Sequence, residues 1–440
     1  MSDRKLKVLL IIEQCNPEWA SVPLVGYRYY EGISKLADVT LVTHDRNEQA
    51  LCNAHPDRHI TYISESKSIK RYYNIAARLS TVKDKTIWPL YNTLIYPIYD
   101  EFNRLVYQKF KDSIFGGKYD IVHAITPMMP RYPVKAVEAC QNTPFVIGPV
   151  NGGVPFPPGF QKISRQEFAY LNFLRLVGRY VIPGYRSTYE KADRILAGST
   201  YTLNLVKNLF NLEDDRIHLS YENGITNSFL KSRNEADEIE ANSEQVNLLF
   251  VGRLVPYKGA DMLIEAIGQL SPAIQQKISL TIVGDGSEKN SLEQQTKTLK
   301  LEDRIVFTGW IPQQETLNYY QKSDVFCFPS VREFGGAVVL EAMAGGLPCI
   351  VVNNGGIGEY VTEATGFKIE PISREHVIEE LKQRIQQLVQ DSNLRKCMSV
   401  QAIERAKEFT WATKAQQMVE MYHEMIGSYR KAAEAQAAYK

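Results

Sequence analysis

The chain has 440 residues, enough for two or three domains, and its apolar content of 44% is typical of a soluble globular protein. No apolar run approaches the ~20 residues that cross a bilayer, which argues against helical membrane spans. The net charge of +1 gives no sign of nucleic-acid binding, and six scattered cysteines without a CxxC pair argue against a disulfide framework or a metal site and fit a reducing, cytoplasmic compartment.

The first elements along the chain predict a doubly wound α/β domain. Residues 7–12 read as a buried strand, because the run lacks the small-residue cleavage site of a signal peptide. The loop 13–26 follows, then a helix at 27–36 and a strand at 39–43. Ligands of such sheets bind at the carboxyl ends of the strands, so the loop is an expected site position. Its candidate residues are Ser21 and Gly26.

A basic stretch with many aromatic residues follows. Residues 66–118 carry 10 basic and 4 acidic side chains, within a first half, 1–225, that holds 28 Lys and Arg against 22 Asp and Glu. A basic, aromatic, helical segment can touch an anionic membrane surface or an anionic acceptor. The alternative, which we favour at this point, is a solvated helical face over an aromatic core.

Three further strands are predicted in the first half. The strand at 119–125 ends beside His123, which is either a site residue facing the ligand edge or a satisfied core histidine. The strand at 144–150 runs into a glycine-rich turn, and the strand at 193–197 precedes a helix that begins at Thr200. Polar candidates at these two strand ends are Asn151 and Ser199, of which Ser199 can equally cap the helix.

A second α/β pattern follows a polar stretch. Residues 231–245 are charged and poor in apolar groups, which predicts a linker or an exposed insert. Apolar runs bounded by glycines then recur in a second series of strands and helices. Strands are predicted at 246–251, 279–283, 304–309, 325–329 and 349–352, and helices at 260–270 and 337–344.

Two cations lie between the first strand and the first helix of this second half. Arg253 and Lys258 share one loop, and the helix that follows offers free backbone N–H groups. Two cations beside a helix start are what a diphosphate needs, since arginine offers a fork and lysine a point charge. Surface ion pairs, each contributing ~0–1 kcal/mol, are the alternative explanation.

Two glutamates flank the start of the helix at 337–344. Glu333 lies in a glycine-rich loop before the helix and Glu341 lies about two turns further along. Carboxylates so placed can accept hydrogen bonds from two polyol pieces of one ligand. Taken singly, Glu333 as a helix cap and Glu341 as the partner of a nearby cation are the simpler explanations.

These residues carry a resemblance to a known family. The run EFGGAVVLEAMAGGLP, with seven residues between Glu333 and Glu341, resembles the paired-glutamate motif of the retaining glycosyltransferases of family 4, also called glycosyl transferases group 1. G-R-x-x-x-x-K-G at 252–259 resembles the diphosphate-binding element of the same family. The resemblance is specific over 246–361, moderate over 119–225 and poor over 13–118, where the usual paired glycines are missing.

The resemblance implies roles for individual residues. Arg253 and Lys258 would neutralise the leaving diphosphate, and Glu333 and His123 would contact the donor sugar. Glu341 would hold the ribose, and the segment around Trp310 would contact the base through its backbone. The implied donor-binding residues are Glu341, Gly284, Trp310, Ile311, Gly335, Gly336, Ala337 and Val338.

The resemblance also implies a GT-B fold: two doubly wound Rossmann-like domains facing each other across a cleft. We expect an acceptor-side domain at 1–228, a donor-binding domain at 229–410, and a C-terminal helix at about 411–440 that crosses back to the first domain. The co-substrate would be a nucleoside-diphosphate sugar, first a UDP-sugar and alternatively a GDP- or ADP-sugar, and neither a cofactor nor a metal is expected. The acceptor is open among polysaccharides, lipid-linked molecules and small molecules.

Two rival functions use the same scaffold. A phosphorylase or epimerase would also bind sugar phosphates, and a non-catalytic partner subunit would keep the fold without the activity. The altered loop at 13–26 favours the partner subunit, whereas the intact set of Arg253, Lys258, Glu333 and Glu341 argues against it.

Overall fold

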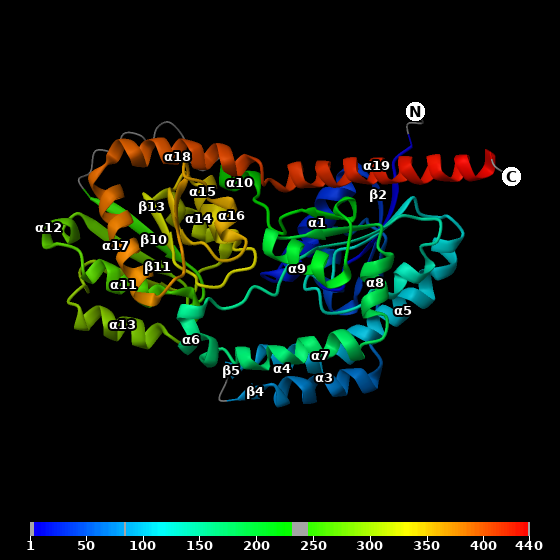
Figure 1. The fold of residues 1–440 in the computed structure, drawn as a ribbon, viewed down its shortest axis with the longest axis horizontal. Coiled ribbons are helices and arrows are strands. Elements are labelled where there is room, and N and C mark those ends of the chain that lie inside the picture. Colours follow the sequence, from blue (N-terminus) through cyan, green and yellow to red (C-terminus); the bar gives the residue numbers. More distant parts are fainter. Residues whose placement is uncertain (1–3, 83–84, 231–244, 439–440) are drawn as a thin grey trace. The chain divides into compact units, whose positions relative to one another are not determined.

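The computed structural model describes residues 4–82, 85–230 and 245–438 (Figure 1). Contacts between Cα atoms divide the chain into two compact units. Unit 1 contains the described parts of residues 1–153, 167–222 and 411–440, and unit 2 contains residues 154–166 and the described parts of 223–410. The linker predicted at 231–245 lies, except for its last residue, outside the described residues.

Unit 1 is built on a seven-stranded sheet in the order β3-β2-β1-β6-β7-β8-β9, in which every neighbouring pair is parallel. The order reverses direction between β1 and β6, which is the pattern of a doubly wound sheet. The strands of this sheet are β1 (Lys7–Ile11), β2 (Asp38–His44), β3 (Ile60–Ile63), β6 (Ile121–Ala124), β7 (Phe145–Val150), β8 (Arg194–Ala197) and β9 (Ile217–Leu219). A short antiparallel pair joins β4 (Thr81–Val82) to β5 (Lys85–Thr86).

Helices cover both faces of this sheet because alternate strand residues point to opposite sides. Val8 and Leu10 of β1 belong to a core shared with α1 (Val22–Leu36) and α19 (Trp411–Ala438). Leu9 and Ile11 belong to a second core, shared with α5. The other helices of the unit are α2 (Glu48–Ala54), α3 (Lys67–Leu79), α4 (Trp88–Leu94), α5 (Tyr96–Phe115), α7 (Phe173–Val181), α8 (Tyr185–Lys191) and α9 (Thr200–Phe210).

The C-terminal helix packs on unit 1, as predicted. Helix α19 runs beside α1 (Figure 1), and Gly32 of α1 leaves no room for a Cβ, which would lie 2.9 Å from Cβ of Ala415. Tyr422 of α19 is fully buried in the same core. The last helix therefore completes one covering layer of the first sheet.

The predicted loop at 13–26 was wrong for residues 22–26, which are helical. Helix α1 begins at Val22, with Pro23 in its first turn, where a missing backbone N–H costs nothing. Gly26 thus lies inside the helix. A side chain would not fit at this position, because a Cβ there would come 2.5 Å from the carbonyl oxygen of Gln14. Ser21 lies at the helix N-cap with a positive φ of 67°. A glycine that allows close packing was mistaken for a loop glycine.

Unit 2 contains a six-stranded parallel sheet in the order β12-β11-β10-β13-β14-β15. Its strands are β10 (Val246–Val251), β11 (Ile278–Val283), β12 (Ile305–Gly309), β13 (Val325–Phe328), β14 (Cys349–Val352) and β15 (Gly366–Ile369). Its helices are α6 (Gln161–Gln166), α10 (Asn227–Leu230), α11 (Ala260–Gly268), α12 (Pro272–Gln275), α13 (Lys289–Thr298), α14 (Gln313–Gln321), α15 (Ala337–Ala344), α16 (Ile357–Tyr360), α17 (Arg374–Gln390) and α18 (Ser392–Lys407).

The central strands of unit 2 are apolar on both faces, so the sequence located them well. All residues of β13 and β14 are buried, and β10 has one partly exposed residue, Asn247. Parallel strands covered by helices on both sides require such continuous apolar runs. Within the described residues, no helix has the length and apolar character to cross a bilayer.

Candidate functional site

The loops after β10 and β13 in unit 2 bring two of the predicted residues into contact. Lys258 ends a short 3₁₀ turn, Pro256–Lys258, and its Nζ forms an ion pair with the carboxylate of Glu333. The ammonium lies 4.9 Å from the ring centroid of Phe328, at the end of β13. Both side chains are largely buried, with relative exposures of 11% and 15%, so this pair is screened less by water than a surface pair.

Arg253 lies in the same loop as Lys258. Its Nη2 donates a hydrogen bond of 2.7 Å to the hydroxyl of Tyr257, whose ring centroid is 5.4 Å from Nζ of Lys258. Tyr257 thus links the two cations, although the guanidinium remains exposed. The loop therefore presents one exposed and one largely buried positive charge at the carboxyl end of β10.

Glycines set the backbone of the neighbouring loops. Gly284, at the end of β11, has a φ of +141°, and a Cβ there would lie 1.9 Å from the carbonyl oxygen of Gly252. Its N–H donates to the carbonyl oxygen of Gly309, 2.9 Å away, at the end of β12. The strand ends of β10, β11 and β12 can approach this closely only because these positions lack side chains.

Helix α15 begins directly beside Glu333. Gly336 is its N-cap residue, with a φ of 56° and no side-chain capping bond, and the helix proper begins at Ala337. Gly335 is buried and Val338 is partly exposed. The first N–H groups of a helix have no partners within the helix, so this end is suited to an anion.

Glu341 is buried on α15, and its carboxylate receives two hydrogen bonds from α14. Gln313 Nε2 donates to Oε1 at 2.7 Å, and the Tyr320 hydroxyl donates to Oε2 at 3.0 Å. Burial raises the pKa of Glu341, and the two hydrogen bonds act in the opposite direction. Sequence reasoning missed both donors, although their spacing of seven residues, two helical turns, places them on one face of α14.

The residues expected beside the base lie between β12 and α14. Trp310 is 74% exposed, and Ile311 is partly buried. A large indole ring at this exposure contributes little to the core. It is available for a ligand at the same edge of the sheet as Arg253.

Residues 154–158 form a strap that packs on the loop carrying Glu333. Arg332 Nε donates to the carbonyl oxygen of Val154 at 2.8 Å, and its guanidinium carbon lies 4.8 Å from the ring centroid of Phe156. Asn354 Nδ2 donates to the carbonyl oxygen of Pro155 at 3.1 Å. No local pattern in the sequence reveals these partners.

Comparison with known proteins assigns part of the chain to a family. Residues 231–405 match the family model described as Glycosyl transferases group 1. These residues belong to that family. The chain is 31% identical over 194 residues to an uncharacterized glycosyltransferase of Methanocaldococcus jannaschii, covering 42% of this chain and 49% of that protein. It is 25% identical over 266 residues to the D-inositol 3-phosphate glycosyltransferase of Kribbella flavida, covering 58% of this chain and 60% of that protein.

The alignments thus span about half to three fifths of these relatives. A solved structure extends the comparison of fold over nearly the whole chain. The Anabaena protein HepE, in complex with UDP, matches with a TM-score of 0.62 and 17% identity, covering 95% of this chain and all of that one. The predicted GT-B fold is confirmed.

His123, in unit 1, is held on both sides of its ring. Nδ1 lies 2.5 Å from the hydroxyl of Tyr422, and Nε2 lies 2.7 Å from the carbonyl oxygen of Gly148. The ring is fully buried, which lowers the pKa of His123 to about 4. Both nitrogens are therefore occupied inside unit 1, and the geometry favours a structural tie between β6, β7 and α19 over sugar binding.

The pKa of His123 predicts how stability depends on pH. An unfolded histidine titrates near 6.5, so between pH 6.5 and about 4 the unfolded chain binds a proton that the folded chain does not. The free energy of unfolding should therefore fall by about 3 kcal/mol as the pH falls through this range. In chemical denaturation, we expect His123→Gln to make the free energy of unfolding depend less on pH. The exposed control His423→Gln should leave that dependence unchanged. Equal slopes in all three proteins would contradict the buried neutral histidine.

The polar candidates Asn151 and Ser199 contact each other in the interior of unit 1. Oδ1 of Asn151 accepts hydrogen bonds from the hydroxyls of Ser199 and Thr202, at 3.0 and 2.9 Å. Ser199 also caps α9, accepting a bond from the N–H of Thr202. This closed network fixes the ends of β7 and β8 and is explained by folding alone.

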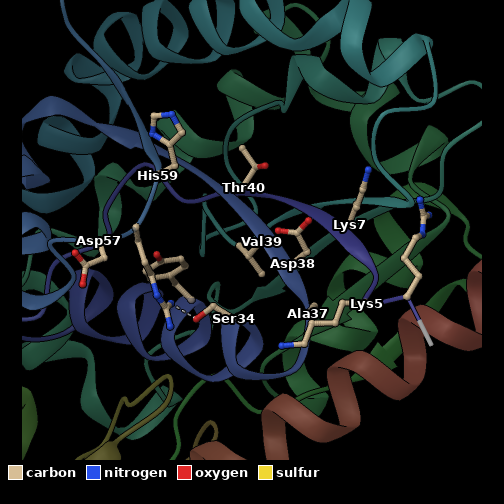
Figure 2. A pocket seen from close by; sticks show the side chains of 12 residues that line it. Lys5, Lys7, Ser34, Ala37, Asp38, Val39, Thr40, Asp57 and His59 are labelled. Atoms are coloured by element: carbon tan, nitrogen blue, oxygen red, sulfur yellow. Dashed lines mark hydrogen bonds between the residues drawn. The ribbon is translucent and has the colours of Figure 1, made fainter.

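Two surface cavities lie outside these groups. The first, with a volume of about 600 Å³, is lined by Lys5, Lys7, Asp38 and Thr40 among others (Figure 2). It lies at the amino ends of β1 and β2, opposite the edge where doubly wound sheets bind ligands. The second, about 260 Å³, lies in unit 2 beside α6 and Val255. Neither is lined by Lys258 or Glu333.

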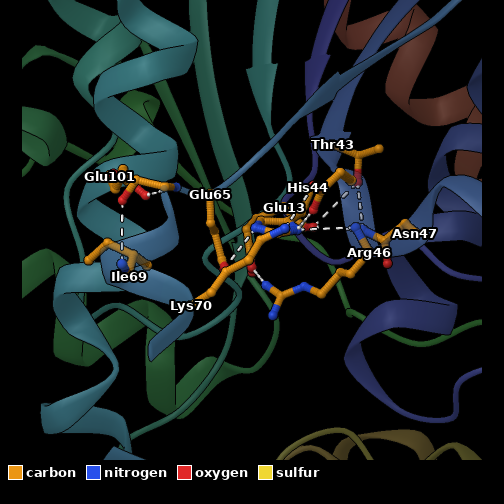
Figure 3. A network of polar contacts seen from close by, with 11 residues as sticks. Glu13, Thr43, His44, Arg46, Asn47, Glu65, Ile69, Lys70 and Glu101 are labelled. Carbon is orange, nitrogen blue, oxygen red and sulfur yellow. Dashed lines mark hydrogen bonds and ion pairs between the residues drawn. The ribbon is translucent and has the colours of Figure 1, made fainter. Parts of the chain in front are cut away.

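A polar network occupies the expected ligand edge of unit 1, at the carboxyl ends of β1, β2 and β3 (Figure 3). Glu13 forms an ion pair with Arg46, and the ring nitrogens of His44 lie 2.9 Å from Asp45 and 2.8 Å from Glu65. The hydrogen bond from His44 lowers the pKa of Glu65. Sequence reasoning reached this edge through the loop 13–26 but missed these residues, which are distant along the chain.

Proposed function

We propose that this chain is a retaining glycosyltransferase that moves a sugar from a nucleoside-diphosphate sugar to a hydroxyl of an acceptor, without a metal. The observation that carries the proposal is the contact of Lys258 with Glu333, beside Arg253 and the start of α15. A cationic loop, a helix N-terminus and a carboxylate at one sheet edge suit a ligand with a diphosphate and a polyol.

The reaction would begin with cleavage of the bond between the anomeric carbon and the diphosphate. Negative charge then develops on the leaving phosphates, where Lys258, Arg253 and the N–H groups of α15 would stabilise it. Donor phosphate would compete with Glu333 for the ammonium of Lys258, leaving the carboxylate to accept hydrogen bonds from the sugar. Attack of the acceptor on the face that the diphosphate leaves would retain the anomeric configuration.

Glu341 would bind the ribose. Each oxygen of its carboxylate already accepts one hydrogen bond, and each has a further lone pair for a ribose hydroxyl. Gln313 and Tyr320 would act as positioning residues that fix the plane of the carboxylate. The exposed ring of Trp310 would lie beside the base, and the backbone of Ile311 would read its edge.

We propose a UDP-sugar as the donor, with GDP- and ADP-sugars as the alternatives. HepE, similar in fold, was solved in complex with UDP and with UDP-glucose. We further propose a cytoplasmic chain whose residues 66–118 contact the inner face of a membrane. Exposed Arg71 and Arg78 on α3 support that contact.

Nucleotide binding tests this function and separates it from its rivals. We expect UDP at a hundred times its dissociation constant to add about 2.7 kcal/mol to the stability of unit 2, seen as a higher melting temperature. GDP and ADP serve as matched controls. Slow hydrolysis of one UDP-sugar, and faster release of UDP when hydroxyl acceptors are added, would support transfer.

Other outcomes identify the rivals. Release of sugar only with inorganic phosphate would indicate a phosphorylase, and a changed sugar configuration without release of UDP would indicate an epimerase. No stabilisation by any nucleotide or nucleotide sugar would overturn the proposal and leave the non-catalytic subunit.

A further inference from the structure

Helix α7 of unit 1 presents its apolar residues to solvent. It runs from Phe173 to Val181, and none of its residues is buried. Its exposed side chains recur with the spacing i, i+3, i+4, i+7 and i+8, which is one continuous face of a helix. Tyr180 is 89% exposed. The exposed face, which we call the α7 stripe, consists of Phe173, Leu176, Val177, Tyr180 and Val181.

The polar side of α7 faces the protein instead. The Nε atoms of Arg175 and Arg179 are shielded from solvent, and burial lowers the pKa of Arg175. Arg179 contributes to the surroundings of Tyr185, a core residue of unit 1. This is the reverse of a helix on a water-facing surface, whose arginines point outward and whose apolar residues point inward. The reversal indicates that a binding partner shields the α7 stripe from water.

Two neighbouring helices of unit 1 also expose apolar side chains. Helix α4 contacts both α7 and α3 (Figure 1), and its Trp88 is exposed. Helix α3 exposes Ile75 and Leu79 together with Arg71 and Arg78. Acidic residues are absent from the sequence between 66 and 82 and between 168 and 189. The exposed residues of these three helices are therefore apolar, aromatic and positively charged.

We propose that the α7 stripe, with α4 and α3, inserts into the interface of an anionic lipid bilayer. Charge selects this occupant over a second copy of the chain, because two such surfaces would place like charges against each other. Apolar and aromatic side chains beside arginines are the composition of helices that lie in the headgroup region. The inference deepens the membrane contact proposed above, and rests on that part of the proposed function, by naming the segment that inserts.

Vesicle binding of the full chain tests this inference. We expect the chain to sediment with vesicles of phosphatidylcholine and phosphatidylglycerol, to bind vesicles of phosphatidylcholine alone more weakly, and to lose binding as salt is raised. The double variant Phe173→Ser/Val177→Ser should lower the partition coefficient about ten-fold. The matched control Val306→Ser/Val400→Ser removes equally exposed valines from unit 2 and should bind as the wild type does.

A charge variant and two further measurements keep the test decisive. Arg71→Glu/Arg78→Glu should weaken binding to the anionic vesicles about ten-fold. Melting temperature and stabilisation by UDP, measured on the same samples, should match the wild type, so a failure of the donor site is seen separately. Absence of wild-type binding to anionic vesicles, or equal binding by the stripe variant, would overturn the inference. So would a wild-type dimer in sedimentation velocity that the stripe variant dissociates.

Discussion

Lys258→Ala is expected to lower turnover by about two to three orders of magnitude, the loss typical when one group that stabilises developing charge is removed. The ammonium is the largely buried cation of its loop, and its partner Glu333 lies just before helix α15. Under the proposed function the charge would act mainly on the leaving diphosphate, so we expect kcat to fall more than KM rises. Steady-state rates with the UDP-sugar that the wild type hydrolyses measure this. Exposed Lys396→Ala is the matched control.

Stability provides a second measurement on the same variant. Removing Lys258 leaves the carboxylate of Glu333, only 15% exposed, without its partner, which should cost about 2 kcal/mol. Lys258→Ala combined with Glu333→Gln should recover most of that stability, because no unpaired charge remains, yet should stay inactive. If the double variant regained turnover as well, or if Lys258→Ala turned over normally, the role at the phosphate would be refuted.

Sequence and structure agree where one local pattern decides the outcome. The strand 246–251 and the helix 337–344 have the predicted bounds, because continuous apolar runs and paired glycines mark them without reference to the rest of the chain. Lys258 and Glu333 were expected at one site because each lies in a motif that resembles the same family. Loops at the ends of adjacent strands in a parallel sheet then bring them into contact.

Long-range contacts explain what the sequence did not reveal. The bonds from Gln313 and Tyr320 to Glu341 and the packing of Arg332 on Phe156 join segments with no shared pattern. Periodicity groups residues of a helix onto one face but does not say which way the face points. Helices α6, α7 and α8 lie between residues 161 and 191, but only the structure reveals that the α7 stripe points outward.

Gly355→Ala is expected to have the second large effect, because it acts on the backbone of Glu333 itself. Gly355 has a φ of +94° and forms a parallel bridge with Glu333, and a Cβ would lie 1.8 Å from the carbonyl oxygen of that residue. The backbone must shift, carrying the carboxylate away from its position. We expect turnover to fall about a hundred-fold and stability to fall by about 2–4 kcal/mol.

Gly117→Ala separates the clash from the conformational cost. Gly117, in unit 1, has a similar φ of +72°, but nothing lies within 4 Å of a Cβ built there. Gly117→Ala should lower the free energy of unfolding by only about 1 kcal/mol, because alanine disfavours the left-handed backbone, and it should keep full turnover. The difference between the two variants in chemical denaturation and in rate therefore measures how strictly the bridge to Gly355 positions Glu333. Equal behaviour of the two would mean that the loop relaxes freely and that its geometry does not control the chemistry.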